Sequence, residues 1–223
     1  MPSIAERYRP RTLDDFCGNA KAVQAVRFLL RQGLGGRALW VSGSTGIGKS
    51  ALGGIIAHTL AADVDITEYD SADQVNATEL ARLSGTLAYR GMGPTGARVV
   101  VVNEAHGLRG PIMRQMLGLL ERLPSHVTII FTTTRDGQAL LFDDIDGRPL
   151  VDRCTRIPLT TQGLSGPFTE RFLTVAAREG FNVPASKARD LLAESGNSLR
   201  AALEWLGTPQ SMTYLQAAET AAA

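Results

Sequence analysis

The sequence feature that most constrains the fold is a glycine-rich stretch between an apolar run and a segment with helical spacing. It reads Gly-Ser-Thr-Gly-Ile-Gly-Lys-Ser over residues 43–50 and matches the pattern GxxxxGK(S/T) at every fixed position. Ala38–Val41 before it has the composition of a buried strand, and Lys49–Ala61 after it has apolar residues three and four apart. A strand, a glycine-rich turn and a helix in this order predict a phosphate-binding loop.

The chemistry of phosphate binding explains this spacing. Glycines let successive backbone N–H groups converge on a phosphate, and the N-terminus of the following helix adds partial positive charge. Lys49 is expected to reach the β- and γ-phosphates, and Ser50 to offer its hydroxyl to Mg²⁺. We therefore predict that ATP and Mg²⁺ bind here, with the nucleotide held by Gly43, Ser44, Thr45, Gly46, Ile47, Gly48, Lys49, Ser50 and Ala51.

Apolar runs alternate with helical segments over the first 160 residues, which is typical of a parallel sheet with helices on both faces. The expected strands are Ala38–Val41, Val64–Tyr69, Val99–Val102, Val127–Thr132 and Arg156–Leu159. The expected helices are Ala20–Gln32, Lys49–Ala61, Asn76–Ala88 and Ile112–Arg122, and Gly91–Gly96 is a loop by composition. We expect an α/β nucleotide-binding domain over residues 1–160.

The strand pattern stops after Leu159. Thr160–Pro167 has the composition of a linker. Helical spacing then predicts short helices at Phe168–Gly180, Ala185–Ser195 and Ser198–Leu206, and a fourth from Ser211 into the alanine-rich end. We expect a small all-α lid domain over residues 161–223.

Composition excludes several other classes of protein. Hydrophobic residues make up 44% of the chain and charged residues 20%, as in globular proteins, and the net charge of +1 provides no global field for nucleic acid. Any contact with DNA must then be a local patch. No apolar run reaches 18 residues and the first residues lack the apolar core of a signal peptide, so we expect a cytoplasmic protein without a membrane span. Two cysteines, Cys17 and Cys154, are too few for a four-cysteine zinc site and are expected to be reduced thiols.

A second apolar run ends in an altered acidic motif, Asn103-Glu104-Ala105-His106. In ATPases with a phosphate loop this place normally carries Asp-Glu, where the aspartate holds Mg²⁺ and the glutamate polarises the attacking water. Glu104 is the expected general base, whereas Asn103 stands at the metal position without a negative charge. We therefore expect weaker Mg²⁺ retention and slower hydrolysis, with less effect on nucleotide binding. His106 is expected to be an ordinary polar residue at the end of a strand.

Several further motifs resemble AAA+ ATPases of the clamp-loader type, such as the bacterial polymerase III gamma subunit, replication factor C small subunits and the phage clamp-loader ATPase subunit. ERYRPRTLDDFCGN, residues 6–19, is similar to that family's E-K-Y-R-P-x-x-L-x-D-(I/F)-(V/I)-G-(N/Q), and residues 70–73 resemble its N-A-S-D. LLERLPSHV, residues 119–127, is close to the gamma-type L-L-K-T-L-E-E-P-P-E-H-V. The matches run in order from residue 6 to about residue 206.

The resemblance implies roles for individual residues. Thr134 is the implied sensor-1 residue, with Thr133 as the alternative. Pro149–Cys154 resembles P-L-x-S-R-C, whose arginine, here Arg153, reaches the ATP bound by the neighbouring subunit. Residues 197–203 resemble G-(S/D)-(L/M)-R-x-A-L, which makes Arg200 the implied sensor-2 residue. The opening motif packs around adenine in the family, which implies adenine contacts by Tyr8, Arg9, Pro10 and Cys17.

The resemblance also implies partners: other subunits in a homo- or hetero-oligomeric ring, expected to be pentameric, a sliding clamp, and primer–template DNA. The sequence departs from the family at Asp152, where the family has serine, and this carboxylate is expected to orient or partly neutralise Arg153. The gamma-type zinc module is absent, and no collar domain follows the lid. We therefore expect a compact or truncated version, or assembly through other contacts.

Two alternatives remain open at the level of sequence. The chain could be a non-hydrolysing ATP-binding subunit of such a complex, which Asn103 favours. It could also belong to another AAA+ machine for DNA, a branch-migration motor or a helicase loader, because residues 133–135 and 150–153 resemble the T-T-R and P-L-x-D-R motifs of the Holliday-junction motor.

Overall fold

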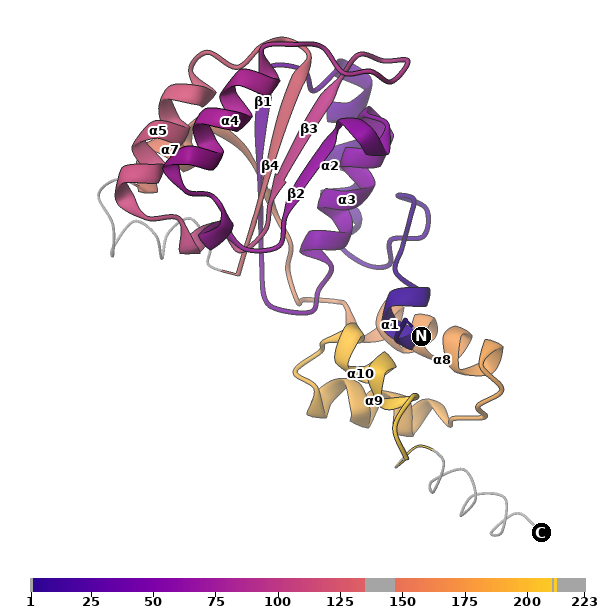
Figure 1. The fold of residues 1–223 in the computed structure, drawn as a ribbon. Coiled ribbons are helices and arrows are strands. Elements are labelled where there is room, and N and C mark those ends of the chain that lie inside the picture. Colours follow the sequence, from indigo (N-terminus) through magenta and orange to yellow (C-terminus); the bar gives the residue numbers. More distant parts are fainter. Residues whose placement is uncertain (1, 135–146, 210, 212–223) are drawn as a thin grey trace, which may run out of the picture. The chain divides into compact units, whose positions relative to one another are not determined.

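The computed structural model describes residues 2–134, 147–209 and 211, and the chain divides into two compact units (Figure 1). The α/β unit comprises residues 21–44 and 48–159, and the helical unit comprises residues 1–20, 45–47 and 160–223. The first 20 residues, which the sequence pattern assigns to the α/β domain, group by their contacts with the helical unit. No helix in the described part of the chain is long and apolar enough to cross a membrane.

The α/β unit is built on a five-stranded parallel sheet with the order β2-β3-β4-β1-β5. The strands are β1 (Arg37–Ser42), β2 (Ile66–Tyr69), β3 (Arg98–Val102), β4 (Val127–Thr133) and β5 (Cys154–Pro158). Figure 1 shows α2 (Ala20–Gln32) and α3 (Lys49–Leu60) on one face of the sheet, and α4 (Ala77–Leu87), α5 (Gly110–Leu120) and α7 (Gly147–Asp152) on the other. The predicted α/β architecture is confirmed.

The burial of the central strands follows from this layering. All seven residues of β4 are buried, as are the four valines of β3. A strand covered on both faces has no solvent side, which is why these segments are apolar runs rather than alternating patterns. The side chains of Trp40 and Phe131 meet in the core on the α4 and α5 side, with ring centroids 5.6 Å apart.

The structure corrects several predicted boundaries. β2 begins at Ile66 rather than Val64, because the residues before it form the 3₁₀ turn η1 (Asp63–Asp65). β5 begins at Cys154 rather than Arg156, since its pairing with β1 extends from Cys154 to Pro158. The short helices α7 and α1 (Ile4–Arg7) were not predicted.

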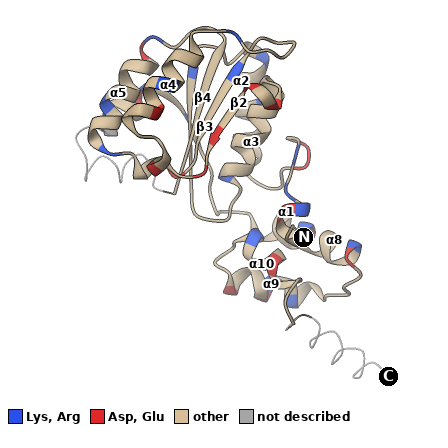
Figure 2. Ribbon diagram, in the orientation of Figure 1, with Lys and Arg blue, Asp and Glu red and all other residues tan. Residues whose placement is uncertain are grey.

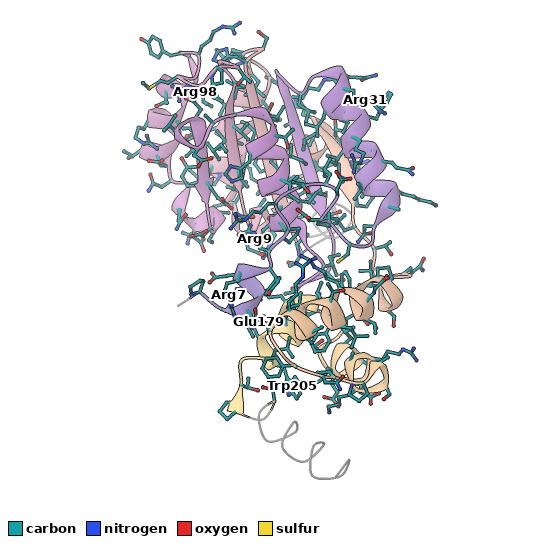
Figure 3. The ribbon with its side chains drawn as sticks, turned by 90° about the vertical axis from the view of Figure 1, so that its right-hand side faces the viewer. Arg7, Arg9, Arg31, Arg98, Glu179 and Trp205 are labelled. Atoms are coloured by element: carbon teal, nitrogen blue, oxygen red, sulfur yellow. The ribbon has the colours of Figure 1, made fainter. Side chains whose placement is uncertain are left out.

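The helical unit contains α1, α8 (Ser165–Arg178), α9 (Ala185–Glu194) and α10 (Leu199–Trp205). The linker predicted up to Pro167 is too long, because α8 already begins at Ser165; proline is tolerated in a first turn, where its missing N–H is not needed. Glu179 accepts hydrogen bonds from Arg7 Nη2 (2.7 Å) and Tyr8 Oη (2.8 Å), as Figure 3 shows for Arg7. These bonds connect the N-terminal segment to the end of α8. The helix predicted from Ser211 onward lies outside the described residues, except for Ser211 itself.

Charged residues are distributed over both units. Figure 2 shows basic and acidic positions interspersed on the helices of each unit, in keeping with a net charge of +1.

Asp65 holds the loop between α4 and β3. Its carboxylate is almost fully buried and accepts hydrogen bonds from Met92 N (2.8 Å) and Gly93 N (2.6 Å), with Arg98 Nη1 3.8 Å away. A Cβ at Gly91 would collide with this carboxylate and with the carbonyl of Ala97, so the close turn requires glycine there. The predicted Gly91–Gly96 loop is therefore ordered by one buried acid.

We expect Asp65→Ala to lower the free energy of unfolding by about 1.5–3 kcal/mol, because it removes charge-assisted hydrogen bonds. Burial raises the pKa of Asp65, but the N–H groups of Gly93 and Met92 and the charge of Arg98 outweigh it, so the pKa lies below its ordinary value. The contribution is therefore fully present above about pH 4 and is lost as the pH falls through the lowered pKa. Urea unfolding of Asp65→Ala and of the unaltered chain, at pH 7 and at acidic pH, measures this difference in the free energy of unfolding. Asp63→Ala, at an exposed carboxylate two residues away, is the control.

Candidate functional site

The candidate nucleotide site lies at the carboxyl ends of three neighbouring strands, β3, β4 and β1. Parallel pairing brings these ends to one edge, with Ser42 opposite Thr133 and Val102 opposite Phe131. The phosphate loop leaves β1 at this edge, where Gly43 N donates to Thr133 O (3.2 Å). Ligands of open parallel sheets bind at such edges.

The backbone of the phosphate loop depends on its glycines. Gly43, Gly46 and Gly48 have φ angles of 146°, 79° and 101°, which other residues rarely adopt. Gly48 precedes α3 without a side-chain cap, so the first N–H groups of that helix are not bonded to a capping side chain. Ile47 is buried and anchors the loop, whereas Ser44 and Thr45 are exposed. Ser50 and Ala51 lie in the first turn of α3.

Lys49 is buried at the start of α3, with 6% of its surface exposed. Its Nζ donates to Ser44 O across the loop (2.8 Å). Burial lowers the pKa of Lys49, and the nearby Glu104 carboxylate opposes that effect. A buried ammonium that is disfavoured in this way gains stabilisation when an anion arrives. This donor set fits the phosphates of a nucleotide.

The acidic motif follows β3 directly. Glu104 adopts a left-handed backbone conformation (φ 51°, ψ 44°) that is strained for a residue with a side chain. Its carboxylate is partly exposed, and Oε2 lies 3.4 Å from His106 Nδ1. The same His106 atom lies 3.4 Å from Thr133 Oγ1. His106 therefore has a more specific place than the sequence suggested, between Glu104 and the end of β4.

Asn103 is held by both of its neighbouring strands. Its Nδ2 donates to Glu68 Oε1 (2.8 Å), and its Oδ1 accepts from Thr132 Oγ1 (2.8 Å). Among the described residues no group of three or more histidine, cysteine, aspartate or glutamate side chains could hold a metal ion. Mg²⁺ that arrives with a nucleotide keeps phosphate and water ligands and needs few from the protein. Asn103 Oδ1 has a second lone pair for such a water, so Asn103 and the Ser50 hydroxyl fit an ion of this kind.

The end of β4 carries three consecutive threonines with different surroundings. Thr132 bonds Asn103, and Thr133 is buried and faces His106. Thr134 follows the strand and is partly exposed. Thr134 lies one residue beyond β4, at the carboxyl edge of the sheet. Thr134 remains the predicted sensor-1 residue and Thr133 the alternative.

Arg153 lies between α7 and β5 and is exposed. Its Nη2 donates to Glu121 Oε1 at the end of α5 (2.7 Å), and its Nη1 donates to Pro149 O (3.2 Å). The predicted partner, Asp152, instead accepts from Arg156 Nη2 (2.6 Å). Glu121, and not Asp152, therefore orients the Arg153 guanidinium.

Comparisons with known proteins give relatives by sequence and by fold. No family model matches the chain. The replication factor C large subunit of Methanosarcina mazei is 33% identical over 136 residues, which are 56% of this chain and 22% of that protein. The replication factor C large subunit of Methanococcus maripaludis is 27% identical over 211 residues, 91% of this chain and 41% of that protein. This chain therefore spans less than half the length of these relatives.

Solved structures give the same fold. The RuvB Holliday junction branch migration motor of Thermotoga maritima has a TM-score of 0.69 at 21% identity, covering 88% of this chain and 63% of that chain. A single-residue variant of that RuvB gives 0.70 at 20% identity, covering 88% and 63%. The chain is thus similar in sequence to replication factor C large subunits and in fold to RuvB. The likeness to RuvB shows the fold of this chain and no more.

The remaining predicted site residues lie in the helical unit. Arg200 is exposed on α10, where its Nε donates to Glu204 (3.3 Å). Tyr8 is bonded to Glu179, and burial raises the pKa of Cys17, which marks it as a structural thiol. Arg9 is exposed and Pro10 is partly buried in the same N-terminal segment. Their roles toward adenine and the γ-phosphate remain predictions.

The sequence analysis did not identify three residues that contact the predicted site residues. They are Glu68, Thr132 and Glu121. Thr132 had a weak signal, since it is a polar residue at the carboxyl end of a mostly apolar strand pattern. Glu68 had no clear signal, because Thr67 beside it in β2 is also polar. Glu121 had no signal in the sequence, because a carboxylate at the end of a helix is ordinarily a solvated surface group.

Proposed function

We propose that this chain binds ATP with Mg²⁺ as a subunit of a clamp-loader-like assembly, and that it couples ATP binding and hydrolysis to loading of a sliding clamp on primer–template DNA. The observation that carries the proposal is the complete phosphate loop with the buried Lys49 at the edge shared with Glu104. The names of the relatives, replication factor C large subunits, support the clamp-loader role.

We propose a role for each site residue. Lys49 and the N–H groups of the loop bind the phosphates, and Ser50 with Asn103 holds the bound Mg²⁺ and its water. Glu104 accepts a proton from the attacking water. We assign Thr134 and Arg200 to sensing of the γ-phosphate, and the adenine to Tyr8, Arg9, Pro10 and Cys17.

We propose that the assembly is a ring, pentameric as in clamp loaders, in the cytoplasm. Arg153 supports this proposal, because it is an exposed arginine that Glu121 orients at the surface, and we assign it to the nucleotide of a neighbouring subunit. The clamp and primer–template DNA are the partners that the clamp-loader role requires.

A second candidate function is favoured by Asn103. Without a metal-binding carboxylate at that position, the chain could bind ATP without hydrolysing it and serve as a nucleotide-sensing subunit. A steady-state ATPase assay of the assembled complex, with and without DNA and clamp, separates the two candidates. Turnover that DNA and clamp stimulate supports the ATPase, and turnover that is absent under every condition supports the sensor.

Lys49→Ala is expected to weaken ATP binding at least about tenfold, because it removes a charge-assisted contact with phosphate of about 1.5–3 kcal/mol. Titration calorimetry with ATP and Mg²⁺ measures the change. Lys21→Ala, at an exposed lysine of α2, is the matched control and should bind as the unaltered chain does. Equal ATP affinity for Lys49→Ala and the control would contradict the phosphate-loop assignment.

A further inference from the structure

A chain of hydrogen bonds crosses three strands at the nucleotide edge. It runs from Glu68 on β2 through Asn103 after β3 to Thr132 on β4, with both links 2.8 Å long. The register explains the contact, because Glu68 is paired with Val101, which shares a face of the sheet with Asn103. A Cβ at Gly53 in α3 would touch the side chains of Val101 and Thr132. Thr132 and Asn103 therefore lie on the face that α3 covers, and Glu68 lies on the same face at the exposed edge strand β2.

The carboxylate of Glu68 fixes the orientation of the Asn103 amide. An ionised carboxylate only accepts hydrogen bonds, so the amide nitrogen must face Glu68 and the amide oxygen must face Thr132. Asn103 is 5% exposed and Thr132 is fully buried, so neither readily exchanges its partner for bulk water. One lone pair of Asn103 Oδ1 is thus held by Thr132, and the other stays available.

We propose that Glu68 is a positioning residue for Mg²⁺ and ATP, which supplies through Asn103 the negative charge that the acidic motif lacks. The inference rests on the proposed nucleotide-binding function. An aspartate at position 103 would set two carboxylates against each other at the distance where Glu68 and Asn103 now share a hydrogen bond. The Asn103 amide forms a hydrogen bond with Glu68 in place of this repulsion. The negative charge then stays on Glu68, one side chain away from position 103. Glu68 and Asn103 therefore act as a matched pair.

Glu68→Gln tests the charge by itself, because glutamine keeps an oxygen that can accept from Asn103 Nδ2. We measure the affinity of a fluorescent non-hydrolysable ATP analogue as a function of Mg²⁺ concentration. Without Mg²⁺, the affinity of Glu68→Gln for the analogue should stay within about twofold of that of the unaltered chain. The Mg²⁺ concentration that gives half of the Mg²⁺-dependent increase in affinity should rise about tenfold. Glu194→Gln, at an exposed glutamate of α9, removes the same charge elsewhere and should leave the Mg²⁺ dependence unchanged.

The double variant Glu68→Gln/Asn103→Asp moves the carboxylate from position 68 to position 103 and keeps an amide beside it. We expect it to recover the Mg²⁺ dependence of the unaltered chain, because the carboxylate then stands at the metal position itself. Thermal unfolding followed by circular dichroism verifies that each variant is folded. Mg²⁺ dependence that is unchanged in Glu68→Gln, or not recovered in the double variant, overturns the inference.

These results are distinguishable from a failure of the proposed function. If the unaltered chain does not bind the ATP analogue at any Mg²⁺ concentration, the nucleotide-binding proposal fails and the inference about Glu68 fails with it. If the unaltered chain binds the analogue and Glu68→Gln has the same Mg²⁺ dependence, only the inference about Glu68 fails.

Discussion

Replacing Arg153 by alanine is expected to lower ATP turnover of the assembled complex by about 10³-fold or more, because arginine fingers supplied by a neighbour contribute about 10³–10⁵ in rate. The affinity of the variant chain for ATP should not change, since its own site keeps Lys49 and the phosphate loop. Steady-state turnover of the complex and calorimetry on the isolated chain measure the two quantities.

Two controls accompany the Arg153 variant. Arg31→Ala removes an exposed arginine of α2 and should leave turnover unchanged. The isolated unaltered chain, shown by light scattering to be a monomer, should hydrolyse ATP slowly or not measurably, because no neighbour supplies the arginine and Asn103 carries no charge. A monomer that turns over at the rate of the assembled complex would contradict the role of Arg153 in a neighbouring site.

Glu104→Gln is expected to lower the rate of hydrolysis in the assembled complex by about 10²–10⁴-fold and to leave ATP affinity within about twofold, because it removes a general base and preserves the shape of the side chain. Single-turnover hydrolysis and equilibrium binding of ATP measure the two effects. Glu170→Gln, at an exposed glutamate of α8, is the control. A Glu104→Gln complex that hydrolyses ATP at the normal rate would show that another group activates the water.

The contacts of Asn103 change the interpretation of the acidic motif. From the sequence alone, Asn103 lacks the negative charge that an aspartate brings to the metal position. Replacing it by aspartate would then be expected to restore the metal site. In the structure Asn103 bonds Glu68 and Thr132 at once, so an aspartate would gain a charge and lose a donor. The effect of residue 103 on hydrolysis therefore depends on residue 68, and the two positions have to be changed together.

Local patterns determined much of the fold. The apolar runs of β1, β3 and β4 and the helical spacing of α2 were enough to predict these elements to within one residue, because burial on both faces leaves a continuous apolar strand and α2 buries one stripe. Errors occurred where a distant contact decides the conformation. The residues before Ile66 form a turn in which the carboxylate of Asp65 accepts hydrogen bonds from the loop beyond α4. No local sequence pattern indicates this distant contact.

The sequence by itself determined the phosphate loop, since its glycines, lysine and serine act within a few residues of one another and need only a strand before them and a helix after them. It also determined that Asn103 and Glu104 follow β3 directly. Only the tertiary structure decided what these side chains meet. Glu68 reaches Asn103 across 35 residues of chain and Glu121 reaches Arg153 across 32, because the order of parallel strands and the packing of helices on them bring together groups that the sequence keeps apart.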